Sequence, residues 1–159
     1  MTKTREISVF SIVMTAVTVL FLGFIFGHSM MTADVSAKES SLTLSFLMEF
    51  CDFLGIPVSL SDFIVRKAAH FAEFALLGIF TVITFYSYFK KAFKYILSEL
   101  FICLAAAVTD ETIQLFVPGR SGQITDVLVD FFGSLAGILI ISLVLLLIKG
   151  IKSKKLTVN

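Results

Sequence analysis

The chain has little charge, few cysteines and no tryptophan. Only 16% of its 159 residues are charged, 57% are hydrophobic and the mean hydropathy is +0.97, whereas a soluble domain carries about 25% charge. This composition excludes an ordinary soluble domain. A net charge of +1 provides no basic surface for nucleic acid, so no nucleic-acid partner is expected. Without tryptophan, the tyrosines and lysines must anchor the protein at the membrane interface.

Two cysteines cannot build a framework of several disulfides. Cys103 lies inside a long hydrophobic segment, and Cys51 lies in a hydrophilic connection. A bridge between positions at such different depths is geometrically unfavourable. We therefore expect both side chains to pack as small apolar groups.

Four segments are long enough to cross a bilayer, which takes about 20 mostly apolar residues. They are Ser8–Gly27, Lys67–Phe89, Tyr95–Val117 and Ile124–Ile148. The first exceeds the apolar core of a usual signal peptide, which favours a retained helix over a cleaved one. The sequence predicts an all-α membrane protein whose residues 1–159 form a single domain, a four-transmembrane-helix bundle.

The long first connection is different in character. Its second half, Leu42–Leu60, alternates large apolar residues with serine and acidic residues, which is typical of an amphipathic helix on a membrane surface. Gly55 and Pro57 are expected to break it. We predict an interfacial helix in this external loop.

Lysine placement predicts the orientation, because positive residues concentrate in cytoplasmic loops. The segments assigned to the cytoplasm contain Lys3, Arg5, Lys90, Lys91, Lys94, Lys149, Lys152, Lys154 and Lys155. Both termini are therefore predicted to be cytoplasmic. The polar residues of the last three spans would then lie within about 12 Å of the outer interface at helical rise. Those residues are Arg66, Lys67, His70, Glu73, Asp110, Glu111, Gln114, Asp126 and Asp130.

Small residues predict where the helices pack. Gly133 and Gly137 lie on the same helix face as Asp126 and Asp130, deeper in the membrane. They form a small-xxx-small stripe, which lets a neighbouring helix approach closely. Matching small surfaces are offered by Ala68, Ala69, Ala72, Ala75 and Ala105 to Ala107. The charged face of each helix is therefore expected to be its packed face.

Three motifs in this region resemble the VanZ-like family. They are Arg66-Lys67-x-x-His70-Phe-x-Glu73, Asp110-Glu111-x-x-Gln114-Leu-Phe-Val-Pro118-Gly119-Arg120, and Asp126-Val-Leu-Val-Asp130-x-x-Gly133. The family often has Tyr at position 74 and Asn at position 130, where this chain has Phe and Asp. The resemblance implies a small protein of the bacterial plasma membrane linked to resistance against lipoglycopeptides such as teicoplanin, and it implies no settled reaction.

The cations of the motifs suit a phosphate at the outer headgroup level. Arg66 and Arg120 offer planar, bidentate guanidinium groups, and Lys67 adds a point charge. The alternative is that they reach to the interface or pair with Glu73 and Asp126. We assign Arg66, Lys67, Gln114, Arg120 and Asp130 to substrate binding, with Phe71, Leu77 and Phe131 as an apolar wall for a lipid chain.

The acidic residues of the motifs allow three interpretations: acid–base catalysis, cation binding and a structural network. Carboxylates held close together raise at least one pKa and can yield a general acid or base, so His70, Glu73, Asp110, Glu111 and Asp126 are the catalytic candidates. They can instead bind a divalent cation through oxygen ligands. They can also form a buried network that fixes helix register. Zinc is disfavoured, because its sites usually offer several His or Cys ligands.

The sequence thus leaves three functions open. The first is an outward-facing site, binding or enzymatic, for a phosphate-bearing membrane lipid, such as a lipid-linked cell-wall precursor or a teichoic-acid-type polymer. The second is a non-enzymatic membrane protein that limits antibiotic access. The third is a structural partner whose polar core only holds helices together.

Overall fold

In the computed structural model, which describes residues 8–55, 61–91 and 93–157, all the regular structure is helical. The helices are α1 (Val9–Ser29), α2 (Ala33–Phe53), α3 (Asp62–Phe89), α4 (Ile96–Gln114) and α5 (Ile124–Thr157). The predicted all-α fold is therefore confirmed. Lys3, Arg5 and Pro57, which entered the predictions of orientation and of the break after Gly55, lie outside the described residues.

Three helices, α1, α3 and α5, are long and apolar enough to cross a membrane. Their outer surfaces match that role, since large apolar side chains such as Leu20 and Phe132 are exposed. The helix α4 is not among them, because its 19 residues include Glu99, Asp110 and Glu111. Its outer face is nevertheless apolar, and Leu97 is 79% exposed.

The helix ends differ from the predicted bounds for local reasons. The helix α3 begins at Asp62 rather than Lys67, because the Ser61 side chain caps it by accepting a hydrogen bond from the Ile64 N–H. The helix α4 ends at Gln114 rather than Val117, just ahead of the Pro118–Gly119 turn, where Gly119 has φ 77°. The helix α5 continues past Ile148 to Thr157.

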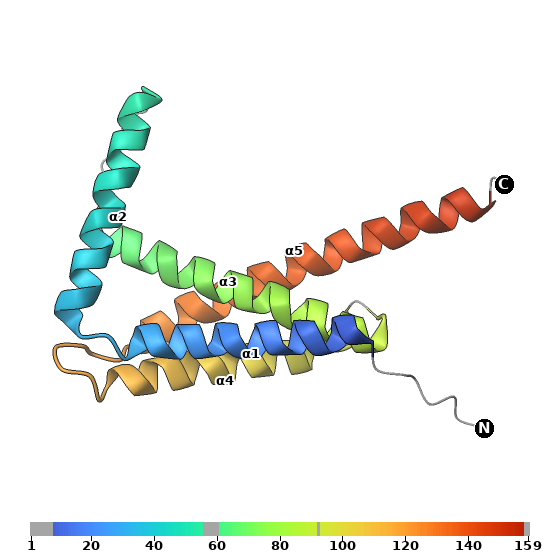
Figure 1. Ribbon diagram of the computed structural model, residues 1–159, viewed down its shortest axis with the longest axis horizontal. Coiled ribbons are helices and arrows are strands. Elements are labelled where there is room, and N and C mark those ends of the chain that lie inside the picture. The colour runs from blue at the N-terminus through green and yellow to red at the C-terminus, as the bar shows by residue number, and fades with distance from the viewer. Residues whose placement is uncertain (1–7, 56–60, 92, 158–159) are drawn as a thin grey trace.

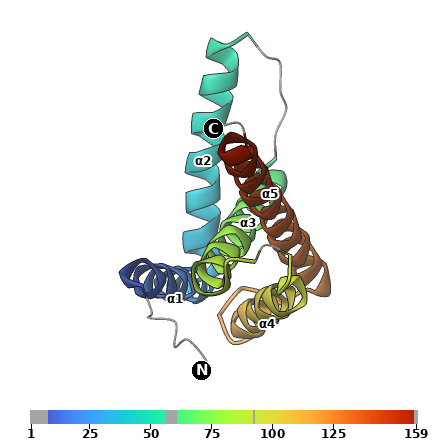
Figure 2. The same cartoon turned by 90° about the vertical axis from the view of Figure 1, so that its right-hand side faces the viewer.

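The helix α2 stands across one end of the other four helices (Figures 1 and 2). It begins at Ala33, whereas the sequence predicted a helix from Leu42, so the serine-rich first half of the connection is helical as well. At the same end of the molecule α1 and α4 finish, while α3 and α5 begin (Figure 1). The first turn of α1 and the last turns of α5 lie towards the opposite end.

The small-residue stripe of α5 packs against α3 as predicted. A Cβ atom at Gly133 would meet the backbone of Phe71, and one at Gly137 would meet the backbone of Ala75. The contact is reciprocal, because a Cβ at Gly78 of α3 would meet the backbone of Ser134. Glycine thus brings the two helices, which cross in Figure 1, to backbone contact.

Hydroxyl groups join α1 to α3 in the half of the bundle away from α2. The Thr18 and Thr84 hydroxyls lie 2.9 Å apart, and those of Thr15 and Tyr88 lie 3.1 Å apart. Cys103 is fully buried in the apolar core beside Phe74 and Leu77, and both cysteines are free, as predicted. Such interhelical hydrogen bonds help hold membrane helices together, where apolar burial discriminates little between protein and lipid.

Candidate functional site

The polar residues singled out in the sequence gather at the end of the bundle that α2 crosses. They come from the first turns of α3, the last turns of α4, the α4–α5 connection and the first turns of α5. Figure 1 shows these segments side by side at its left, with the last turn of α1 beside them. Two stretches distant in sequence, residues 66–73 and residues 110–130, therefore supply one polar region.

Asp110 and Gln114, one turn apart on α4, anchor a hydrogen-bonded network. The Gln114 side-chain amide donates to Asp110 Oδ2 at 3.0 Å and to Glu111 Oε1 at 3.2 Å. Ser29, in the last turn of α1, donates its hydroxyl to Asp110 Oδ1. The Gln123 backbone N–H donates to Glu111 Oε2 at 2.8 Å. The network ties the ends of α1 and α4 to the residue that precedes α5.

Lys67 and Asp126 form an ion pair between the first turns of α3 and α5. Both side chains are mostly buried, at 17% and 11% exposure. The Lys67 ammonium also lies 5.2 Å from the centre of the Phe63 ring. The amine is thus held by protein groups, as the pairing alternative for this residue predicts.

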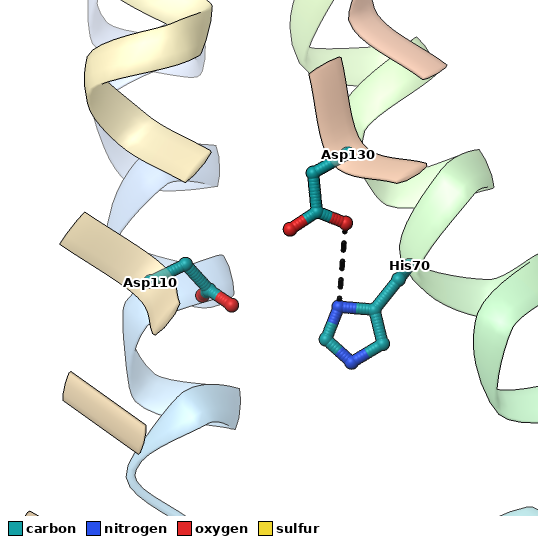
Figure 3. Close-up of side chains that lie close together, drawn as sticks. All are labelled: His70, Asp110 and Asp130. Carbon is teal, nitrogen blue, oxygen red and sulfur yellow. Dashed lines mark ion pairs between the residues drawn. The ribbon is translucent and has the colours of Figure 1, made fainter. Parts of the chain in front are cut away.

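His70, Asp110 and Asp130 come from α3, α4 and α5 and point into one space (Figure 3). One ligand atom of each lies within 4.8 Å of those of the other two. His70 Nδ1 is 3.6 Å from Asp130 Oδ1, which is an ion-pair distance but too long for a hydrogen bond. Both aspartates are completely buried.

A small polar cavity of about 200 Å³ borders this group at His70. It is lined by Ala33, Arg66, His70, Gln114, Gly119, Arg120, Ser121, Gln123 and Asp126. Two guanidinium groups therefore share its wall with a carboxylate, an imidazole and two side-chain amides.

Arg120 lies in the connection between α4 and α5 and is incompletely paired. Its Nη2 is buried and has no hydrogen-bond partner among the described residues. Burial lowers the pKa of the Arg120 guanidinium, and the positive charge of nearby Arg66 lowers the pKa further. The two arginines repel one another, so an anion between them would relieve both effects.

A second cavity of about 790 Å³ lies between α1, α2 and α3. Its walls include the apolar side chains of Phe24, Met31, Leu42 and Val65. Arg66 and His70 line this cavity as well as the small one, so the two cavities meet at these residues. The apolar wall of this large cavity differs from the predicted one. Leu77 is fully buried in the core, and neither Phe71 nor Phe131 lines the large cavity.

The predicted site residues fall into three groups, according to which cavity, if any, they line. Arg66, His70, Gln114, Arg120 and Asp126 line the small cavity, and Glu73 lines the large one. The remaining four contact those residues from outside the cavity walls. Asp110 and Glu111 bond Gln114, Asp130 faces His70, and Lys67 pairs with Asp126.

The sequence did not reveal the contribution of α1 and α2. His28 Nδ1 lies 3.1 Å from Glu73 Oε1, and His28 Nε2 lies 3.1 Å from Glu39 Oε2. This histidine bridges carboxylates from two other helices, while its neighbour Ser29 binds Asp110. The available signal was that two polar residues, His28 and Ser29, follow one another at the end of an apolar span. That pattern fits equally well a helix that simply ends at the membrane surface.

Comparison with models of known protein families gives a match. A family model described as VanZ/LLP1 matches residues 10–146. The match covers the three motifs, all of α2, α3 and α4, and most of α1 and α5. Searches of curated proteins and of solved structures each gave no match.

Proposed function

The chain belongs to the VanZ/LLP1 family, and we propose that it binds the phosphate-bearing headgroup of a cell-envelope lipid. The headgroup occupies the small polar cavity, and the lipid chain lies in the large cavity between α1, α2 and α3. The observation that carries the proposal is that Arg66 and His70 line both spaces. An amphiphile with a compact anionic head and a long apolar tail matches this pair of cavities.

The charges favour an anion in the small cavity. Arg120 has a buried N–H group without a partner, and Arg66 adds a second guanidinium close to it. Arginine binds phosphate oxygens through two parallel N–H donors, which makes it suited to this ligand. Lys67 is already paired with Asp126, so in our proposal it positions that carboxylate rather than the phosphate.

The large cavity suits a hydrocarbon chain. Its lining combines the apolar residues Phe24, Met31, Leu42 and Val65 with the polar residues His28, Glu39 and Glu73. Ligand cavities that are mostly apolar with a few convergent polar groups are typical binding sites. Arg66 and His70 line both cavities, so in our proposal the lipid lies with its headgroup at these two residues.

The site faces outward in our proposal. The helix α4 makes a fourth crossing, because it runs beside α1 in Figure 1 and presents exposed apolar residues such as Leu97 and Phe101. With lysines concentrated at the opposite end, the positive-inside rule places both termini in the cytoplasm of a plasma membrane. The helix α2, which stands across the end of the crossing helices in Figure 1, then lies in the outer interface.

A structural role for part of the polar region is favoured by a different observation. Asp110 and Glu111 accept hydrogen bonds from Ser29, Gln114 and the Gln123 backbone, so their oxygens already join several segments. These acids hold the site in shape, whereas the arginines contact the ligand. Glu73 and Asp126 complete the charge balance at the cavity edges.

A tolerance assay in bacteria tests the function. Expression should raise tolerance to a teicoplanin-like lipoglycopeptide more than tolerance to an unlipidated glycopeptide. The change Arg120→Gln should return tolerance to that of cells without the protein, while Lys94→Gln, a charge loss at the opposite end, should leave it unchanged.

Protein accumulation in the membrane is measured for each variant, so that loss of tolerance is not loss of protein. Full tolerance in both Arg66→Gln and Arg120→Gln would overturn the headgroup site. That result would favour a protein that limits antibiotic access without binding an anion there.

A further inference from the structure

The space between α3, α4 and α5 contains a set of side chains suited to a metal ion. His70, Asp110 and Asp130 each direct one nitrogen or oxygen atom into it, and these atoms lie within 4.8 Å of one another (Figure 3). Three atoms bound to one ion at about 2.1 to 2.2 Å lie no more than about 4.4 Å apart. Small rotations of the side chains would bring all three within bonding distance.

Asp130 provides an independent observation. Its side chain is completely buried, yet neither carboxylate oxygen has a hydrogen-bond partner among the described residues. A buried charged group without hydrogen bonds is strongly disfavoured. The facing His70 Nδ1 is also buried and without a hydrogen-bond partner among those residues. Both groups face the space that Asp110 also borders (Figure 3), so one occupant of that space could serve His70 and Asp130 together.

The formal charges point to the same conclusion. Two aspartates and a neutral histidine leave two negative charges, and Glu73 and Glu111 add further negative charge around them. The amine of Lys67 is already paired with Asp126, and Arg120, which interacts with Asp110 and Glu111, makes no ion pair with either of them among the described residues. Burial of uncompensated charge among apolar helices is costly. A divalent cation would balance the two aspartates.

We propose that His70, Asp110 and Asp130 bind one divalent cation next to the small polar cavity. One imidazole with two carboxylates mixes the donor types favoured by transition metals and by magnesium, a combination that Mn²⁺ accepts. His70 lines the cavity, so the ion would be reached from that side. The inference concerns the ion alone and does not depend on lipid binding.

Ser29 and Gln114 fit this assignment. They donate to opposite oxygens of Asp110, which orients the carboxylate while leaving each oxygen a further lone pair. Outer hydrogen bonds of this kind hold metal ligands in place in known sites. The two residues are therefore positioning residues for the proposed ion.

The test uses the full chain purified in detergent, stripped with a chelator and titrated with Mn²⁺ without added lipid. We expect one Mn²⁺ per chain, and electron paramagnetic resonance of the bound ion should show coupling to one imidazole nitrogen. The changes Asp130→Asn and His70→Gln should each weaken binding more than about 10-fold, since even outer-shell changes cost 10- to 100-fold. The nitrogen coupling should vanish in His70→Gln.

The matched control is Glu99→Gln, which removes a buried carboxylate from the other end of α4 and should leave binding unchanged. Absence of Mn²⁺ binding, or of nitrogen coupling, in the unaltered chain would overturn the proposal without any variant. Equal binding by Asp130→Asn and Glu99→Gln would overturn it as well. Because no lipid is present, neither result bears on the headgroup proposal.

Discussion

The hydroxyl of Ser29 donates a hydrogen bond to the buried carboxylate of Asp110, which lies 81 positions later in the sequence. This contact joins the last turn of α1 to the last turns of α4 at the level of the polar cavity. It makes the first helix part of the site, although the three sequence motifs all lie in the later helices.

We predict that Ser29→Ala destabilises the protein by about 1–3 kcal/mol, because a buried carboxylate loses one of its two hydrogen-bond donors. Thermal unfolding in detergent measures the effect. Ser98→Ala is the control, since Ser98 is exposed on α4. Equal unfolding temperatures for the two variants would show that the contact to Asp110 does not stabilise the fold.

The crossing of α3 and α5 gives a second prediction. Gly137→Ala should cost about 1–3 kcal/mol of stability through overpacking, because the added Cβ meets the backbone of Ala75. Gly23→Ala on α1 should change stability by no more than about 0.5 kcal/mol, since nothing lies within 4 Å of its Cβ position. The comparison is read from the unfolding midpoints, and a neutral Gly137→Ala would contradict the close approach.

The topology provides a third prediction. A reporter active only in the cytoplasm should work when fused after Asn159 and fail when inserted at Gly119, in the connection between α4 and α5. A periplasmic or extracellular reporter should give the opposite pattern. Activity of the same reporter at both positions would mean that α5 does not cross the membrane as proposed.

Much of the fold was predictable because its signals are local. Apolar length predicted α1, α3 and α5, and the spacing of Gly133 and Gly137 identified the face of α5 that packs on α3. The start of α2 at Ala33 was missed, because its first half is rich in polar residues and carries no apolar periodicity.

The site was predictable only in part. Charges within apolar segments indicated the residues of α3, α4 and α5, since such charges are costly unless they face the protein interior. The partners from α1 and α2 depend on how the chain turns between those helices. Nothing in the spacing of His28 or Glu39 shows that the two side chains lie 3.1 Å apart. The predicted apolar wall for the lipid chain was also wrong in part, because Leu77 faces the core.

The headgroup proposal is tested most directly by the stability of the purified chain with a polyprenyl phosphate and with the polyprenol of equal length. A ligand at 100 times its Kd stabilises by about 2.7 kcal/mol. We expect the phosphate to reach that value and the alcohol to give a much smaller effect. The double change Arg66→Gln with Arg120→Gln should lose the difference between them, while Lys94→Gln should retain it. Equal stabilisation by the two lipids, or a phosphate effect that persists in the double-arginine variant, would contradict the proposed site.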